Sequence, residues 1–330
     1  MPPPGGGKAI SLLGEASEEV GSSPPAAVLF AAGRGHRLRP LTDEVAKPAL
    51  PLLDVPLAAF GLRRLYEAAP AVLLNVRHLP DSVTAAVAPY VPPERRLNTL
   101  FEAPEAYGTA GTLVALRDRL GPRVLTWNSD LLTDLTAGSL LGSHAASGAP
   151  ATVAVAEVAA GADFVLEGGR AVGFVDRRRR AAASGGVFIG AAVFERTALE
   201  ALPGTRPLGL GETLLASLAS SGELAVHRHG GYWRDVGTPG TYLEASLDLL
   251  EGRGPEPPDR RWPGEVVDGS YVGPGAIVEG ELGPGAVVLA GARVAAGARV
   301  ERAIVWPGEV VPAGAVVHDG IRFRGRTLPV

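Results

Sequence analysis

The stretch of sequence that decides the fold is FAAGRGHRLRPLTDEVAKPALPLL, residues 30–53. It continues a short apolar run, places Gly33 and Gly35 one residue apart, and then brings Arg37 and Lys47. An apolar run before a glycine turn indicates a buried strand that ends in a tight loop. Glycines let backbone N–H groups approach an anion, and the cations could surround a polyphosphate. By composition alone, a basic surface loop explains the stretch equally well.

Two familiar phosphate-binding patterns do not account for this loop. The P-loop pattern G-x-x-x-x-G-K-[ST] is absent from it, and Leu38 stands where the dinucleotide fingerprint G-x-G-x-x-G requires its last glycine. The type of phosphate site therefore has to come from other segments of the chain.

Short apolar runs alternate with helix-like segments from residue 26 to about residue 250. Such alternation predicts a Rossmann-like α/β domain with a mixed, mostly parallel sheet and flanking helices. Ligands of such sheets bind beyond the carboxyl ends of the strands, where the opening loop lies. Strands are expected at 26–33, 71–76, 123–130, 151–158 and 171–176, and helices at 57–69, 82–90, 110–120, 211–222 and 240–250.

The two ends of the chain differ from this central part in amino-acid composition. Residues 1–24 are rich in Pro, Gly and Ser and predict a flexible tail, which leaves a catalytic domain at 25–250. Residues 251–265 carry prolines and charges and predict a linker.

Residues 266–330 predict a left-handed, hexapeptide-repeat β-helix, because glycines recur at a fixed spacing from valines. Gly275, Gly285, Gly291, Gly297, Gly308 and Gly314 each stand three residues before a valine: Val278, Val288, Val294, Val300, Val311 and Val317. The alternative is a glycine-rich linker, which lacks a valine register. The open ends of such a helix favour self-association, so a homo-oligomer is expected.

The overall composition excludes several classes of site. The chain has 330 residues, a formal net charge of −4 and no cysteine. Disulfides, zinc–thiolate sites and cysteine nucleophiles are therefore excluded, and no global charge favours nucleic acid or an acidic membrane. No apolar run is long enough for a membrane span, and the first residues lack a signal-peptide pattern, so we expect a cytoplasmic protein.

Four segments, in order, resemble motifs of the sugar-phosphate nucleotidylyltransferases. They are AAGRGHRLRPLTDEVAKPALPLLDVPL in the opening loop, YGTAGTL at 107–113, VLTWNSDLLTD around Asp130 and GYWRDVGTPGTYLEA around Asp235. The family joins a nucleoside triphosphate to a sugar 1-phosphate and releases pyrophosphate. The GTAG segment and the C-terminal β-helix most resemble the GDP-mannose pyrophosphorylases, which implies GTP and mannose 1-phosphate as substrates. Thymidylyl-, uridylyl- and heptose-phosphate guanylyl-transferases share much of the same pattern, so other nucleobases and sugars stay open.

The resemblance implies roles for individual residues. Gly33 and Gly35 would cradle the phosphates through backbone amides, Arg37 would grip the β- and γ-phosphates, and Lys47 would hold the reacting phosphate. Neighbouring Ala32 and His36 would complete this part of the nucleotide site. The GTAG segment would line the nucleobase and sugar pocket through Gly108, Thr109 and Gly111.

The resemblance also implies Mg²⁺, held by Asp130 and Asp235. Magnesium prefers oxygen ligands and usually takes one or two carboxylates together with phosphates, which fits this pair. Asp134, four residues after Asp130, is expected to have a capping or surface role instead. The expected catalytic residues are therefore Arg37, Lys47 and Asp130.

The sugar-phosphate end departs from the family pattern. Where the family carries E-K-P, this chain has Asp176 and Arg177, and Arg177 is the expected phosphate ligand, although a solvated turn is the alternative. Gly186, in the segment SGGVFIG that stands for the family's N-A-G-x-Y, is the second expected contact with the sugar phosphate. A phenylalanine, Phe164, replaces a glycine that would face the sugar hydroxyls.

These departures keep two other functions open. A non-catalytic paralogue that binds an NDP-sugar is favoured by the altered E-K-P segment and opposed by the intact Arg37, Lys47, Asp130 and Asp235. An acyltransferase built on the β-helix would need a histidine base, and the β-helix offers only His318 near its end.

Overall fold

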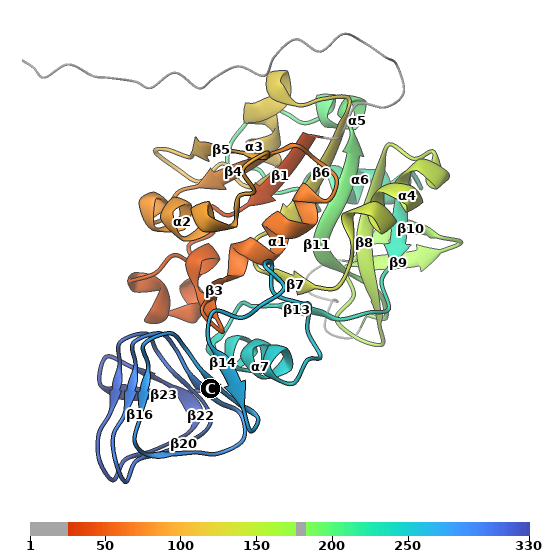
Figure 1. The fold of residues 1–330 in the computed structure, drawn as a ribbon. Helices are drawn as coiled ribbons and strands as arrows, with labels where there is room; N and C mark the ends of the chain where they lie inside the picture. Colours follow the sequence, from red (N-terminus) through yellow and green to blue (C-terminus); the bar gives the residue numbers. More distant parts are fainter. Residues whose placement is uncertain (1–25, 176–182) are drawn as a thin grey trace, which may run out of the picture.

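The computed structural model describes residues 26–175 and 183–330, so the tail expected at 1–24 lies outside the described residues. Figure 1 shows a layered α/β part and, beside α7, a three-sided stack of short strands at the C-terminal end. The two parts correspond to the segments expected as an α/β domain (25–250) and as a β-helix (266–330).

A nine-stranded mixed sheet forms the centre of the α/β part, which confirms the expected α/β class. The expectation of a mostly parallel sheet was wrong, because four of the eight neighbouring strand pairs are antiparallel. Its strand order is β5-β4-β1-β6-β11-β8-β12-β10-β9. The strands β5, β4, β1 and β6 are mutually parallel, whereas β11 runs antiparallel to both β6 and β8. The bounds are β1 (Ala26–Phe30), β4 (Ala71–Val76), β5 (Arg96–Phe101), β6 (Arg123–Asn128), β8 (Ala151–Val158), β9 (Phe164–Glu167), β10 (Arg170–Phe174), β11 (Gly185–Glu195) and β12 (Leu224–Arg228).

Helices cover both faces of this sheet, so its central strands are apolar on both sides. Along β1, Ala27 and Leu29 pack in one core with residues of α1, α2 and α4, and Val28 and Phe30 pack in another with residues of α3, α5 and α6. The bounds are α1 (Leu57–Tyr66), α2 (Pro80–Val87), α3 (Thr109–Leu116), α4 (Ala137–Ser147), α5 (Arg196–Glu200), α6 (Ala216–Ser220) and α7 (Pro239–Leu250). The helix expected at 211–222 is divided into a π-helical turn, η7 (Gly211–Leu215), and α6. Among the described residues, no helix combines the length and the apolar character that a membrane crossing requires.

Two small antiparallel pairs shape the region beyond the carboxyl ends of the central strands. One joins β2 (Pro51–Leu52) to β3 (Val55–Pro56), and the other joins β7 (Leu131–Thr133) to β13 (Trp233–Asp235).

The C-terminal part is built of coils that stack in parallel, as the glycine and valine register predicts. Tyr271 pairs with Val287, and Arg299 pairs with Val316, each one coil further along the chain. The six repeated glycines all have φ between 67° and 75°, a conformation that side chains disfavour, and five of the six valines are buried. Left-handed winding and self-association stay predictions. The strands are β14 (Glu265–Val267), β15 (Ser270–Val272), β16 (Ile277–Val278), β17 (Glu281–Leu282), β18 (Ala286–Val288), β19 (Arg293–Val294), β20 (Arg299–Val305), β21 (Val310–Val311), β22 (Val316–Phe323) and β23 (Arg326–Pro329).

The segment between α7 and β14 packs against the α/β part. Arg63 of α1 donates to the carbonyl oxygen of Pro257 at 2.8 Å, and the Trp262 ring lies 6.3 Å from that of Phe60. The connection expected as a linker is thus held against α1.

Candidate active site

A cavity of about 450 Å³ opens beyond the carboxyl ends of β1, β4 and β6. Most of the residues singled out in the sequence line it. Its lining is Phe30, Ala32, Gly33, Gly35, His36, Arg37, Lys47, Pro48, Asn75, Glu102, Ala106, Gly108, Thr109, Asn128, Ser129, Asp130 and Gly237. Of the residues expected to bind the nucleotide, Gly111 is the one that does not line the cavity.

The glycine loop wraps the open end of this cavity. Gly35 has φ +66° and starts the short helix η1 (His36–Leu38), whose Leu38 is buried beneath the loop. The Thr42 hydroxyl donates to the Gly35 carbonyl oxygen at 2.9 Å and closes the loop. Two further short helices, η2 (Leu41–Asp43) and η3 (Lys47–Ala49), bring Lys47 back to the cavity.

Gly35 is a position where only glycine fits. A Cβ there would lie 2.9 Å from Thr42 Cγ2 and 3.1 Å from Lys47 Cβ, and the positive φ adds backbone strain. We expect Gly35→Ala to lower the free energy of unfolding by about 1–3 kcal/mol, measured by urea denaturation. Gly33→Ala is the matched control, because a Cβ at Gly33 meets nothing within 4 Å. Equal stability of the two variants would contradict this account of the loop.

Two cations and two carboxylates meet at the edge of the cavity. Lys47 Nζ lies 2.6 Å from Asp130 Oδ2 and 3.7 Å from Asp235 Oδ1. Arg37 Nη2 lies 3.7 Å from Asp235 Oδ2. The Lys47 side chain is only 11% exposed, whereas that of Arg37 is 68% exposed.

The β7–β13 ladder explains why two distant aspartates meet. Asp130 lies two residues after the end of β6 and directly before β7, and Asp235 pairs with Leu131, the first residue of β7. The Val236 N–H donates to the Asp130 carbonyl oxygen at 3.1 Å. The backbone thus holds the two carboxylates on the same side of Lys47.

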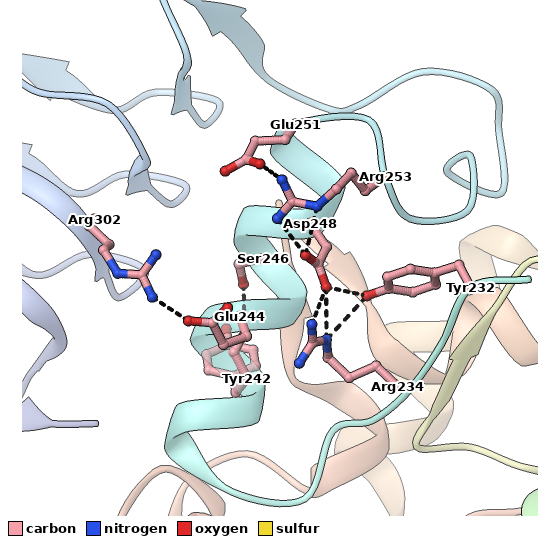
Figure 2. Close-up of polar contacts among 9 residues, drawn as sticks. All are labelled: Tyr232, Arg234, Tyr242, Glu244, Ser246, Asp248, Glu251, Arg253 and Arg302. Carbon is pink, nitrogen blue, oxygen red and sulfur yellow. Dashed lines mark hydrogen bonds and ion pairs between the residues drawn. The ribbon is translucent and has the colours of Figure 1, made fainter. Parts of the chain in front are cut away.

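A hydrogen-bond network around Asp248, a buried residue of α7, fixes the strand that carries Asp235. Figure 2 shows the Asp248 carboxylate receiving hydrogen bonds from Tyr232, Arg234 and Arg253, with Arg234 Nη2 at 2.5 Å. Burial opposes ionisation of Asp248, but these hydrogen bonds hold its pKa below its usual range. Arg234, the residue before Asp235, is therefore tied to α7 by its hydrogen bonds to Asp248.

Burial and the neighbouring carboxylate of Asp130 raise the pKa of Asp235. Burial is the main cause, followed by repulsion from Asp130, and the cations Lys47 and Arg37 oppose both. A carboxylate whose pKa is raised by burial and by a neighbouring carboxylate gains from binding a cation.

Because its pKa is raised in the folded state, ionised Asp235 slightly lowers the free energy of unfolding. Its contribution to stability is greatest below the ordinary carboxyl range and is lost as the pH rises through its raised folded-state pKa. At pH 7, Asp235→Asn is therefore expected to raise the Tm of the metal-free protein by about 1–2 °C, a small gain because the side chain is half-exposed. Thermal unfolding at pH 7 and pH 4 measures it. The gain should shrink at pH 4, and a Tm that falls at pH 7 would contradict the assignment.

These carboxylates fit a magnesium ion that shares its coordination with phosphates. Within 26–175 and 183–330, no three His, Cys, Asp or Glu side chains gather where protein alone could ligate a metal. Magnesium commonly takes one or two carboxylates, with waters and substrate phosphates completing its coordination. Asp130 and Asp235 would hold it, and Lys47 would turn from the carboxylates toward a phosphate.

A buried polar network forms the inner wall of the cavity, and sequence reasoning missed one of its members, Asn75. The Ala31 N–H donates to Asn75 Oδ1 at 2.7 Å, and Asn75 Nδ2 donates to Glu102 Oε1 at 2.8 Å. The Thr112 hydroxyl and the Tyr107 N–H also donate to the Glu102 carboxylate, at 2.6 and 2.8 Å. Glu102 is 1% exposed, so this carboxylate joins β1, β4 and the GTAG segment. A single polar residue in the run AVLLNV was the sequence signal for Asn75.

The N-terminus of α3 is capped by protein rather than open to a ligand. The Ala110 and Gly111 N–H groups both donate to the Leu208 carbonyl oxygen, at 2.9 and 3.1 Å. A Cβ at Gly108 would lie 2.4 Å from the same oxygen, so the close packing requires this glycine. The structure therefore leaves Gly108 and Thr109 facing the cavity and turns Gly111 toward Leu208.

Of the two residues expected at the sugar phosphate, Gly186 does not line the cavity. Arg177 lies outside the described residues. Gly186 is buried in β11, and a Cβ there would lie 3.1 Å from Leu166 Cδ1, so it packs in the sheet. Phe164 is buried and packs edge-on against Phe174, 5.6 Å between ring centroids, and hence faces the core.

The remaining polar residues are placed as structural elements. Asp134 Oδ1 lies 2.9 Å from His229 Nε2, away from Lys47, in agreement with the expected non-catalytic role. Trp127 is fully buried in the core. The strand that carries His227, β12, lies inside the nine-stranded sheet, between β8 and β10.

The chain is similar to a family of nucleotidyl transferases and to several of its named members. The family model described as "Nucleotidyl transferase" matches residues 26–252. Mannose-1-phosphate guanylyltransferase of Mycobacterium tuberculosis is 29% identical over 88% of this chain and 82% of its own length. A probable mannose-1-phosphate guanylyltransferase of Oryza sativa is 25% identical over 89% and 85%, and a glucose-1-phosphate adenylyltransferase of a Shewanella strain is 26% identical over 92% and 87%. The crystal structure of HddC from Yersinia pseudotuberculosis matches with a TM-score of 0.58 at 16% identity, over 68% of this chain and 99% of that one.

Proposed function

Because the chain belongs to the nucleotidyl transferase family, we propose that it transfers a guanylyl group from GTP to mannose 1-phosphate in a magnesium-dependent reaction. Its relatives in the comparison act on sugar 1-phosphates, and two of the three carry the guanylyltransferase name. The observation that carries the proposal is the meeting of Lys47, Asp130 and Asp235 beside the glycine loop.

The reaction needs binding and charge rather than a protein nucleophile. A phosphate oxygen of the sugar 1-phosphate forms a bond to the α-phosphorus of the nucleotide. The bond from that phosphorus to the bridging oxygen breaks, and pyrophosphate leaves with its electron pair. Catalysis then consists of positioning the two reactants in line and stabilising the negative charge that spreads over the phosphates.

The residues of the cavity can supply both. The glycine loop offers backbone N–H groups to the β- and γ-phosphates, Arg37 can turn onto them, and the Lys47 ammonium can reach the α-phosphate. Asp130 and Asp235 would hold Mg²⁺, which neutralises phosphate charge when bound. The Asn75–Glu102 network fixes the wall against which the nucleoside would lie.

A panel of four NTPs against mannose, glucose and heptose 1-phosphates, with coupled detection of pyrophosphate, tests the proposal. We expect turnover that requires Mg²⁺, with GTP and mannose 1-phosphate giving the highest kcat/KM. Faster turnover of ATP with glucose 1-phosphate would refute the substrate assignment and leave the reaction class standing. Tight binding of an NDP-sugar with no turnover of any pair would instead identify a non-catalytic paralogue.

A further inference from the structure

The phosphate-binding loop and the C-terminal β-helix share one hydrophobic core. Leu41 and Leu50 of the loop are completely buried in the same cluster as Trp306 and Phe323 of the β-helix. The rings of Trp306 and Phe323 meet edge to face, with centroids 5.4 Å apart. The β-helix therefore forms part of the floor on which the loop rests.

One carboxylate of the loop enters a slot between successive coils. Asp54 Oδ2 accepts a hydrogen bond from the Tyr271 hydroxyl, and Asp54 Oδ1 accepts one from the Ala290 N–H, both at 3.0 Å. A Cβ at Gly273 would lie 2.2 Å from Asp54 Oδ2, so the slot is closed on that side by bare backbone. Burial raises the pKa of Asp54, and these hydrogen bonds partly oppose the rise.

The turn that carries this carboxylate has a backbone that needs outside support. Leu53 and Asp54 join β2 to β3 and have φ of +46° and +61°. Two-residue hairpin turns of this kind favour Asn and Gly, and a side chain such as Leu costs free energy there. Such a conformation persists where neighbouring contacts determine it, and the contacts here are the buried Leu53 side chain and the Asp54 slot.

A buried run of chain connects the slot to the charge cluster. From Lys47 through Leu53 every residue is buried except the partly buried Pro51. Leu57 N–H donates to the Leu50 carbonyl oxygen at 2.9 Å and ties the run to the start of α1. A displacement at Asp54 therefore has no exposed hinge at which to be absorbed before Lys47.

The second polar contact between loop and β-helix is weaker in kind. Glu44 Oε1 lies 2.5 Å from Arg324 Nε, but both side chains are exposed. Exposed ion pairs contribute little, so the buried Asp54 contact is the one able to fix the loop.

We propose that Asp54 is a positioning residue through which the β-helix holds Lys47 at the reacting phosphate. The proposal rests on the proposed function, because it assigns Asp54 a part in that reaction. It makes the β-helix a component of the catalytic apparatus, since Tyr271 and Ala290 supply the partners.

The test compares Asp54→Asn and Tyr271→Phe with Glu279→Gln. Asparagine keeps the shape of Asp54 but places an N–H group where one of the two donors, the Tyr271 hydroxyl or the Ala290 N–H, now meets an acceptor oxygen. Phenylalanine at 271 removes the hydroxyl donor from the β-helix side of the same contact. Glu279 is the control, because it binds Arg293 on the exposed face of the β-helix, away from the loop. For each variant we would measure kcat, KM for GTP and hydrogen exchange by mass spectrometry.

We expect Asp54→Asn and Tyr271→Phe to lower kcat by about 10-fold or more, as small displacements of catalytic groups do. Hydrogen exchange should rise at residues 41–53 and stay unchanged at 71–76, and Glu279→Gln should match the wild type. Wild-type kcat with unchanged exchange at 41–53 in both variants would overturn the proposal. So would an exchange increase spread over the whole chain with kcat reduced only by the unfolded fraction. Should the wild type itself lack turnover, the proposed function fails, and exchange at 41–53 alone still decides whether Asp54 fixes the loop.

Discussion

Lys47→Met is expected to lower kcat for nucleotidyl transfer by on the order of 10²–10³-fold, the usual loss when one preorganised charge is removed from a transition state. Lys47 is the least exposed cation of the cluster and the only one of its two cations that contacts both Asp130 and Asp235. Methionine keeps much of the length of the side chain and removes the charge. Initial rates of pyrophosphate release at saturating substrates measure the effect.

The control for Lys47 lies in the same loop. Arg39 is exposed, pairs with Asp43 at 3.0 Å and does not line the cavity. Arg39→Met should therefore keep kcat within about threefold of the wild type, since a surface ion pair contributes little. Equal losses in the two variants would show that the loop acts through its overall positive charge and would contradict the role given to Lys47.

Asp130→Asn is expected to lower kcat by on the order of 10²-fold and to raise the Mg²⁺ concentration needed for half-maximal rate. The substitution removes one of two carboxylates suited to the ion and also the closest partner of Lys47. Magnesium titrations of the initial rate separate the two effects. If magnesium binding alone is impaired, excess Mg²⁺ restores the rate.

Asp134→Asn is the matched control, four residues further along the same segment. Asp134 is bound to His229 and has no contact with the cluster, so its half-saturating Mg²⁺ concentration should equal that of the wild type. A shift as large as that of Asp130→Asn would mean that the metal lies elsewhere along β7.

The sequence predicted this cluster because the fold brings strand ends together. Gly33, Gly35 and Asp130 each follow an apolar run, and parallel strands end at one edge of a sheet, so their meeting could be expected. Asp235 was reached through resemblance, and the structure gives the physical reason in the β7–β13 ladder, whose strands are too short to be found from periodicity.

Other features depend on contacts between distant segments, which no local pattern encodes. The burial of Glu102 follows from three donors on different elements, and the cap on α3 comes from Leu208, far along the chain. The valine register predicted the coils of the β-helix, yet nothing in residues 266–330 indicated that Tyr271 would receive Asp54. How two parts of a protein dock depends on the shapes of both surfaces. The periodicity of apolar residues along the sequence does not encode those shapes.

The most direct test of the central claim is ³¹P nuclear magnetic resonance of the wild-type protein with GTP, mannose 1-phosphate and Mg²⁺. The account predicts loss of the GTP and mannose 1-phosphate resonances, with pyrophosphate and a sugar nucleotide appearing in equal amounts, and no change when EDTA is present. Hydrolysis of GTP to GDP and phosphate, with mannose 1-phosphate untouched, would contradict it.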